Sequence, residues 1–260
     1  MRAYVLASGS EGNATYIETT NHKILLDAGR NTKFLTNQLA KLGIDIHDID
    51  LIFISHGHKD HTESLPVLLK HIHPTVYVGE NMLEEVPSIK YYENLVFYED
   101  NVIQFDDFNV ELINTSHDAA DSHGFIFTIE GKKLVQITDT GYLNLKYLNK
   151  LRDADYYIFE SNHDVEMIIN GPYPDYLKAR IVGPKGHLSN KEASIYLAKM
   201  VDLNTKKVVL AHLSRHNNTE EKALETVQEI FKEYGNSFNN FVCAKPDEIV
   251  EVVAWLRLFV

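Results

Sequence analysis

Four side chains able to bind metal ions stand within six consecutive residues of this sequence. They follow the apolar segment 51–55 and are His56, His58, Asp60 and His61. Imidazole suits zinc, iron and manganese, and a carboxylate adds negative charge that helps to hold such ions. Gly57 lets the backbone turn so that His56 and His58 can converge. Because neighbouring imidazoles without an ion repel one another when protonated, this spacing predicts a metal centre.

A metal centre made of histidine and aspartate is typical of catalysis. Structural zinc sites usually use thiolates, whereas this chain has one cysteine, Cys243. One loop cannot complete two coordination spheres, so further ligands must come from elsewhere. The candidates directly follow strand-like runs and are His117, Asp139 and His212. Taken singly, each is equally well explained as a structural polar residue, but as a set with the loop they would complete two spheres.

The elements that must position these residues are short strands and amphipathic helices. Strands rich in Val, Ile, Phe and Tyr are predicted at 3–7, 14–18, 23–27, 51–55, 75–79, 102–105, 108–114, 125–130, 132–138, 155–160 and 207–211. Helices are predicted at 31–42, 62–72, 142–151, 189–201 and 218–233. Turn and cap signals support them, namely Glu130-Gly131-Lys132 as a hairpin turn, Ser189 with Glu192 as a capping box, and Thr219 as an N-cap. The mixture predicts sheets covered by helices on their outer faces.

The composition favours one domain that spans residues 1–260. No linker or low-complexity tract divides the chain, of which 44% is hydrophobic. No apolar run reaches 18 residues and the N-terminal run is too soon interrupted for a secretory signal, so we expect no membrane segment. Cys243 lies in an apolar run and fits a buried thiol in a reducing compartment, which predicts a cytoplasmic location.

The net charge and the apolar C-terminal run indicate which binding partners can be expected. The net charge of −12 disfavours general nucleic-acid binding, so a polyanionic substrate would need a local basic surface or the metals themselves. The apolar run 252–260 is expected to pack on the core or to contact another subunit. The sequence predicts no particular oligomeric state.

With these ligands in this order, the sequence resembles the metallo-β-lactamase fold superfamily. Asp27, which closes Ile24-Leu25-Leu26-Asp27, matches the first motif of that family, and the resemblance runs from about residue 1 to about residue 218. It implies an α/β fold, a four-layer αββα sandwich of two mixed sheets with outer helices. It also implies two divalent metal ions (zinc or manganese, with iron as a third option), one bound by His56, His58 and His117, the other by Asp60, His61 and His212, with Asp139 as the bridge and Asp27 as a hydrogen-bonding support for a ligand histidine.

Four further segments resemble the YycJ/WalJ group of this superfamily. They are Ser8–Asn13, Glu160–Asp164, Gly186–Asn190 and His212–Asn218. That group is associated with bacteria that carry the WalK/WalR two-component system and with 5′-to-3′ exonuclease activity on double-stranded DNA. The resemblance implies a dinuclear phosphodiester hydrolase that acts on DNA with a metal-bridging hydroxide as its nucleophile. No cysteine lies near Asp139, which disfavours β-lactam hydrolysis.

Roles for the remaining candidates follow from this resemblance. Asp60 is expected to orient the hydroxide as well as to bind metal. His187 is the candidate general acid and His163 a second candidate, although each is also explained as a structural histidine. Backbone amides in a glycine-containing turn can cradle a phosphate, and a plain turn is the alternative for the candidate substrate-binding residues Ser8, Ser10 and Asn13. A local basic rim could come from Lys59, Arg180, Lys185 and Arg215.

Two other functions stay open at this point. A hydrolase of a small cyclic phosphodiester or thioester should have a closed pocket, whereas a DNA enzyme should have a basic groove that leads to the metals. A non-catalytic regulatory protein that kept the fold is the third interpretation. The presence of all seven ligands disfavours it.

Overall fold

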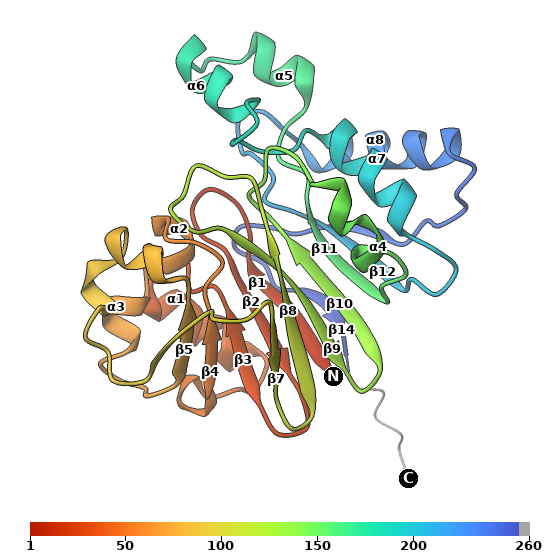
Figure 1. Ribbon diagram of the computed structural model, residues 1–260. Coiled ribbons are helices and arrows are strands. Elements are labelled where there is room, and N and C mark those ends of the chain that lie inside the picture. Colours follow the sequence, from red (N-terminus) through yellow and green to blue (C-terminus); the bar gives the residue numbers. More distant parts are fainter. Residues whose placement is uncertain (255–260) are drawn as a thin grey trace.

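Two seven-stranded β-sheets face one another and carry their helices on the outside (Figure 1). The computed structural model describes residues 1–254. The first sheet has the order β14-β1-β2-β3-β4-β5-β6 and consists of β1 (Arg2–Ala7), β2 (Ala14–Glu18), β3 (Lys23–Leu26), β4 (Leu51–Phe53), β5 (Thr75–Val78), β6 (Leu95–Phe97) and β14 (Val250–Val253). The second has the order β13-β12-β11-β10-β9-β8-β7 and consists of β7 (Val102–Gln104), β8 (Phe108–Asn114), β9 (His123–Ile129), β10 (Lys132–Ile137), β11 (Tyr156–Glu160), β12 (Lys207–Ala211) and β13 (Phe241–Cys243).

Both sheets are mixed, and both follow the same plan. In the first sheet β1, β2 and β3 pair antiparallel and β3 to β6 pair parallel. In the second, β7 to β10 pair antiparallel and β10 to β13 pair parallel. The carboxyl ends of parallel strands meet at one edge of a sheet, so each sheet brings several strand ends together, where ligands usually bind.

Helices cover the outer face of each sheet, as the predicted four-layer αββα sandwich requires (Figure 1). The helices are α1 (Thr32–Lys41), α2 (Lys59–Thr62), α3 (Leu65–Leu68), α4 (Leu148–Leu151), α5 (Val165–Asn170), α6 (Asp175–Ile181), α7 (Asn190–Met200) and α8 (Glu220–Glu233), with 3₁₀ turns η1 (Ile46–Asp48), η2 (Glu80–Glu84), η3 (Pro87–Ile89) and η4 (Leu145–Tyr147). The first sheet packs against α1 and α3, and the second against α4, α7 and α8. The short helices α5 and α6 project from this body.

The strand side chains alternate between two cores. In β3, Ile24 and Leu26 enter the layer between the sheets, while Leu25 packs under α1. In β10, Leu134 enters the same central layer, while Val135 packs under the helices of the second sheet. Because both faces of these strands are covered, they are apolar throughout, which explains the continuous apolar runs of the sequence.

The predicted turn and caps are confirmed. Glu130 and Gly131 both have positive φ (53° and 73°) and join β9 to β10, the geometry that a two-residue hairpin loop requires. The Ser189 side chain accepts a hydrogen bond from the Glu192 amide and forms the capping box of α7. Thr219 caps α8 in the same way. Cys243 is buried, and burial raises the pKa of its thiol to about 12.

Other sequence expectations are wrong in detail. The predicted helix 62–72 contains only the last residue of α2 and the short helix α3, because Pro66 in the first turn of α3 has no amide hydrogen with which to continue α2. The predicted helix 142–151 begins only at 145, where the Asn144 side chain caps a 3₁₀ turn. The elements β6, β13, β14, α5 and α6 were not predicted from the sequence. Part of the C-terminal run, 255–260, lies outside the described residues, and within 1–254 no helix is long and apolar enough to cross a bilayer.

We predict that His22 stabilises the fold in a pH-dependent way. Its ring nitrogens lie 2.5 Å from Asp50 Oδ2 and 3.2 Å from Asp106 Oδ1. Burial lowers the pKa of His22, but hydrogen bonds and charge from Asp50 and Asp106 outweigh it and raise that pKa above its usual value. The stabilisation is therefore complete below the unfolded-state pKa of about 6.5 and disappears as the pH rises through the folded-state pKa.

Urea unfolding of His22→Gln at pH 6 and pH 9 measures this effect. We expect a loss of about 1 kcal/mol at pH 6 and a smaller loss at pH 9. His47→Gln is the matched control, since His47 also contacts an aspartate but is 64% exposed in its side chain. An equal loss for His22→Gln at both pH values would contradict the prediction.

Candidate metal centre and active site

The histidine loop leaves β4 and is clamped by three neighbouring segments. The Asp60 carbonyl accepts a hydrogen bond from the Asn13 amide (2.7 Å), and the His61 carbonyl accepts one from the Ala28 amide (2.8 Å). On the other side, the His123 amide donates to the Ser55 carbonyl across the two sheets (3.0 Å). These bonds to the main chain fix the loop from both sides.

Gly29 makes the closest of these approaches possible. A Cβ atom at this position would lie 1.8 Å from the Asp60 carbonyl oxygen and 2.5 Å from the Asn13 amide nitrogen. No side chain could be accommodated there without moving the histidine loop. The glycine therefore serves the site by its lack of a side chain.

Three residues at the ends of strands adopt the left-handed backbone conformation. They are Asp27 after β3 (φ 60°), Asp139 after β10 (φ 57°) and His212 after β12 (φ 58°). This region is uncommon for residues other than glycine, and such residues cluster at functional sites. Each of the three turns its side chain into the same space between the two sheets.

The predicted ligands come together in two groups. The nitrogen atoms of His56, His58 and His117 lie within 4.8 Å of one another and form the first group. The second group obeys the same limit and consists of Asp60, His61, Asp139 and His212. Asp139 lies between the groups, since its Oδ2 is 3.3 Å from His61 Nε2 and its Oδ1 is 3.9 Å from His117 Nε2. The first sheet supplies the loop ligands, and the second sheet supplies His117, Asp139 and His212.

Several atoms in these groups are buried without a hydrogen-bond partner. They are His56 Nε2, Asp139 Oδ2 and His212 Nε2. A buried polar atom that pairs with nothing is costly and needs an explanation. Divalent cations bound between the groups would supply the missing partner for all three atoms. The donor set of imidazoles and carboxylates fits such ions, which agrees with the expected divalent metal binding.

Asp27 stands directly behind the second group. Its Oδ2 accepts a hydrogen bond from His61 Nδ1 (2.8 Å), and its Oδ1 accepts one from the Ser55 amide (2.8 Å). This arrangement turns His61 Nε2 toward Asp139. A carboxylate that orients a histidine in this way is the usual support for a metal ligand.

Glu160 is the residue that the sequence analysis left without a role. It is fully buried at the end of β11, and its Oε1 lies 2.8 Å from His187 Nδ1 and 3.1 Å from His212 Nδ1. Its Oε2 accepts hydrogen bonds from the amides of Thr140 and Leu188. One carboxylate therefore orients two histidines of the candidate site. The available signal was an acidic residue that closes an apolar run, as Asp27 does.

The buried charges shift the pKa values in opposite directions. Burial lowers the pKa of His56 well below its usual value, so this imidazole is neutral. Burial also opposes the charge of His212, but Asp139, Asp60 and Glu160 raise its pKa to about 10. Burial raises the pKa of Glu160, but His187 and His212 bring it down to about 2. Binding of a cation to His212 would therefore have to displace a proton.

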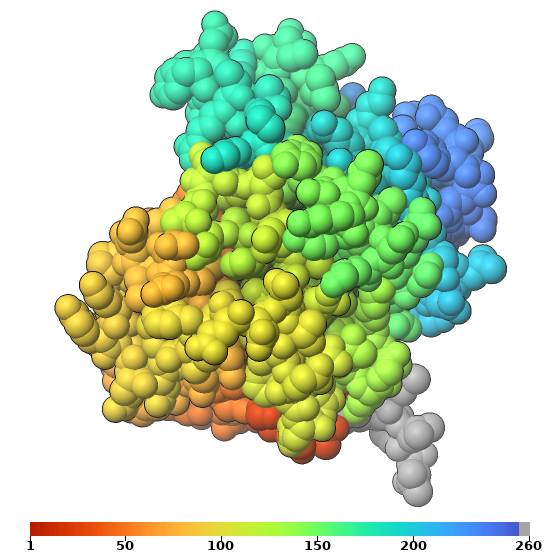
Figure 2. Space-filling model, in the orientation of Figure 1, coloured from red at the N-terminus to blue at the C-terminus, as the bar shows by residue number. Residues whose placement is uncertain are grey.

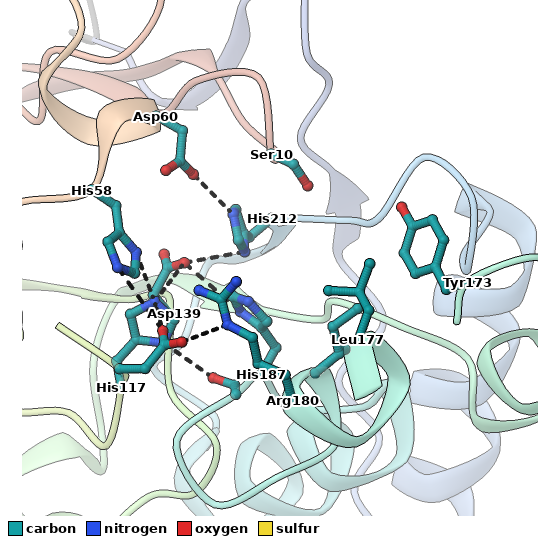
Figure 3. Close-up of a pocket in the computed structure, with 13 residues that line it drawn as sticks. Ser10, His58, Asp60, His117, Asp139, Tyr173, Leu177, Arg180, His187 and His212 are labelled. Carbon is teal, nitrogen blue, oxygen red and sulfur yellow. Dashed lines mark hydrogen bonds and ion pairs between the residues drawn. The ribbon is translucent and has the colours of Figure 1, made fainter. Parts of the chain in front are cut away.

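The ligand groups open into a cavity of about 260 Å³. His187 lies at its edge, with its ring centroid 5.1 Å from those of His117 and His212. Figure 3 shows His58 and Asp60 on one side and Tyr173 and Leu177 on the opposite side. The cavity joins the ligand groups to a partly apolar wall.

The other predicted site residues take different places. Ser10 lines the cavity, whereas Ser8 and Asn13 are buried beneath it. The Ser8 hydroxyl accepts a hydrogen bond from the His212 amide, and Asn13 Nδ2 lies 3.0 Å from His61 Nε2. His163 is also buried and does not line the cavity. Its main chain forms an isolated parallel β-bridge with that of Ser189.

The four residues of the expected basic rim are dispersed. Arg180 lines the cavity and donates to Asp118 (2.6 Å). Lys59 lines a neighbouring hollow, which shares Ser10 and Asp60 with the cavity. Arg215 pairs with Glu11 and Asp247, and Lys185 is exposed away from the cavity lining. The described residues thus form no continuous basic groove around the ligands.

Comparisons with known proteins agree with this geometry. The Beta-lactamase superfamily domain model matches residues 22–213. The chain is 37% identical to "Exodeoxyribonuclease YycJ" of Bacillus anthracis over 235 residues, which cover 89% of each chain. It is 35% identical to "Exodeoxyribonuclease WalJ" of Streptococcus pneumoniae over 229 residues, which cover 86% of this chain and 85% of that protein.

Solved structures share the fold. The metallo-beta-lactamase fold protein YhfI from Bacillus subtilis has a TM-score of 0.73 at 16% identity, covering 96% of this chain and 98% of that one. The short form of human tRNase Z has a TM-score of 0.68 at 18% identity, covering 98% and 100%. At this identity the likeness concerns the arrangement of sheets and helices alone.

We predict that metal removal destabilises the protein. Treatment with a chelator should leave the buried carboxylates without their cations, and a divalent ion at 100 times its Kd stabilises the folded state by about 2.7 kcal/mol. For a chain of this size, the corresponding loss of Tm is about 5–10 °C. Differential scanning calorimetry with and without chelator, followed by return of zinc or manganese, measures it.

Two variants make this test specific to the ligand groups. Asp139→Asn should lose the metal-dependent rise in Tm, because Asp139 lies between the groups. The exposed His47→Ala should keep it. Equal Tm values for chelated and metal-loaded wild-type protein would sink the prediction.

Proposed function

This chain belongs to the metallo-β-lactamase superfamily and is a metal-dependent hydrolase, and we propose that it is a dinuclear 5′-to-3′ exonuclease that acts on DNA. The observation that carries the proposal is the Asp139 carboxylate between two groups of ligand side chains. The nuclease reaction is suggested by the relatives YycJ and WalJ, which are named exodeoxyribonucleases. We further propose that residues 1–260 act as a single domain.

The distances support two ions rather than one. His56, His58 and His117 offer three nitrogen atoms to a first ion. A second ion would take its ligands from the other group. Asp139 would be shared, because its carboxylate lies 3.9 Å from His117 Nε2 in the first group and 3.3 Å from His61 Nε2 in the second. Two divalent ions supply Lewis acidity, which activates water and offsets charge that develops on a phosphate during displacement. Zinc, manganese and iron all accept this donor set.

We propose that His187 donates the proton that the leaving oxygen requires. Its ring lines the cavity beside His117 and His212, and it is not one of the seven predicted ligands, although it forms a further group of possible ligands with Asp139, Glu160 and His212. Glu160 holds His187 Nδ1 at 2.8 Å, so Nε2 is the nitrogen left to deliver a proton. His163, buried away from the cavity, would serve the fold of this region rather than the proton transfer.

Asp60 and Ser10 complete the proposed site at the other end of the cavity. Asp60 Oδ2 lies 3.5 Å from His61 Nε2 and 3.6 Å from His212 Nε2, so it can bind metal and orient the attacking water. Ser10 stands beside Asp60 in the cavity lining and offers a hydroxyl to a phosphate. Ser8 and Asn13 would act indirectly, because they hold the main chain of His212 and the side chain of His61.

A small-phosphodiester hydrolase is the second candidate. The net charge of −12 and the dispersed basic residues favour it, since DNA binding usually rests on many phosphate contacts. The cavity of about 260 Å³ is also near the lower limit for a pocket that holds a small molecule. The experiment must therefore offer both kinds of substrate.

We predict that the purified, metal-loaded protein removes nucleotides stepwise from the 5′ end of an end-labelled duplex. Asp60→Ala should abolish the reaction, because it removes a metal ligand. His187→Ala should lower kcat by a factor of about 10²–10⁴, the usual contribution of a general acid. Lys185→Ala, a change in the neighbouring loop outside the cavity, should retain full activity.

The same proteins are assayed with bis-p-nitrophenyl phosphate. Hydrolysis of this compound without any cleavage of DNA would reject the nuclease proposal and favour the small-substrate candidate. Cleavage that starts from the 3′ end would reject the proposed polarity alone. Metal analysis of the active protein should give two ions per chain, and a single ion at full activity would reject the dinuclear arrangement.

We predict that Glu160 acts as a positioning residue for His187. Glu160→Gln keeps the shape of the side chain but replaces the charged oxygen that faces His187 and His212. Loss of such a supporting carboxylate typically costs about 10–100-fold in activity. The measurement is the dependence of kcat on pH, in which the basic limb should move, while KM changes little. A loss of kcat with an unchanged pH profile and lower Tm would instead indicate a structural role.

A further inference from the structure

Helices α5 and α6 form an arm beside the cavity. The arm, defined here as residues 165–182, projects from the sandwich (Figure 1) and stands as a separate knob on the surface (Figure 2). It faces the ligand groups with the residues Tyr173, Leu177, Arg180 and Ile181, all of which line the cavity. The sequence analysis assigned no element to this segment.

The cavity therefore has two chemically different walls. On one side stand the metal ligands, which include His58, Asp60 and Asp139. On the other side stand the aromatic ring of Tyr173 and the aliphatic chain of Leu177 (Figure 3). A nucleotide has the same polarity, with an anionic phosphate at one end and a flat, stackable base at the other.

Tyr173 is partly buried. Its ring contacts that of His216 edge-to-face, with 5.7 Å between the centroids and an interplanar angle of 65°. Hydrogen bonds connect the arm to the body of the protein at both ends. Just before it, the Asp164 amide donates to the Asn217 carbonyl (2.8 Å), and near its end the Ile181 carbonyl accepts from the His187 amide (2.8 Å). An aromatic ring with an accessible side is the feature that holds unpaired bases in nucleic-acid-binding proteins.

The size of the cavity limits what can enter. Its volume of about 260 Å³ lies below the range of about 300–1,000 Å³ that is usual for drug-sized ligands. A single nucleotide residue is the smallest unit of DNA that can reach both walls of this cavity at once. A terminal residue of a duplex must then leave its partner strand before it reaches the metals, at an unpairing cost that other enzymes also meet.

We propose that the cavity takes one unpaired 5′-terminal nucleotide, with its base against Tyr173 and Leu177 and, at the metal ligands, the phosphodiester that joins its 3′-oxygen to the next residue. Attack of water on this phosphorus breaks the bond to the 3′-oxygen, which leaves with a proton from His187. This inference rests on the proposed exonuclease activity and adds the substrate subsite. Arg180, whose Nε is engaged by Asp118, lies between the two walls and can contact the backbone of the same residue. Removal of one nucleotide per cut follows from this geometry.

The test compares two duplexes whose 5′-terminal residue is unpaired in both, so that neither pays the cost of unpairing; this residue carries a mismatched base in one and is abasic in the other. Wild-type protein should cleave the base-bearing end about 5- to 100-fold more efficiently in kcat/KM, the effect of stacking one base. Tyr173→Ala should lose that preference, so that it cleaves the two ends with similar kcat/KM. Tyr173→Phe should retain the preference, because it keeps the ring.

Tyr176→Ala is the matched control. Tyr176 belongs to the same arm, is 77% exposed and does not line the cavity, so this variant should keep the preference of the wild-type protein. A terminal mismatch should also accelerate cleavage by the wild-type protein, because it removes the cost of unpairing.

These measurements distinguish failure of the proposed nucleotide subsite from failure of the proposed exonuclease activity. Stepwise cleavage with the same preference in wild-type and Tyr173→Ala proteins would overturn the subsite while leaving the exonuclease intact. Release of dinucleotides or longer pieces as first products would overturn it as well. Failure of the metal-loaded wild-type protein to cut any DNA end would overturn both proposals together.

Discussion

The gathering of carboxylates around His212 is the constraint on which the rest of the site depends. Asp60, Asp139 and Glu160 lie 3.6, 3.5 and 3.1 Å from its ring nitrogens, in a region that is almost closed to water. Charges in such surroundings are costly unless they are paired. His212 Nε2 and Asp139 Oδ2 nevertheless lack hydrogen-bond partners. Bound cations would correct the charge and the missing contacts at once, so the cluster is understandable as a set of ligands and hardly otherwise.

The sandwich supplies the rigidity that this cluster requires. Asp27, Asp139 and His212 each adopt a left-handed conformation, which costs about 1–2 kcal/mol for a residue other than glycine. Each of the three lies at or just after the end of a strand whose side chains are buried on both faces. Local hydrogen bonds add to this support; the His212 amide, for example, donates to the Ser8 hydroxyl. The well-packed sheets offset the local strain. The side chains of Asp27, Asp139 and His212 are therefore directed by strand ends rather than by flexible loops.

The sequence contained the local part of this site but not the part created by packing. The loop around His56 and the strand-end position of Asp27 are visible as spacing and pattern, and the sheets follow from apolar runs. The role of Glu160 could not be predicted, because it depends on distant parts of the sequence. Only the fold places β12 and the His187 loop beside β11. Asn13 lies in a turn that could equally have faced solvent, and only the tertiary structure brings its amide to His61. The arm was missed because helices so short and exposed carry little periodic signal.

The arm also bears on how an acidic chain could act on DNA. An enzyme with a net charge of −12 gains little binding free energy from contacts with many phosphates along a DNA backbone. A mode of binding that engages one nucleotide, through metals at one end and stacking at the other, needs few such contacts. The Ile181 carbonyl at the end of the arm also accepts the His187 amide, so the wall that would hold the base and the proposed acid belong to one connected unit. Binding energy from the base could then be used to hold His187 in its reactive position, which is the way that remote contacts contribute to kcat.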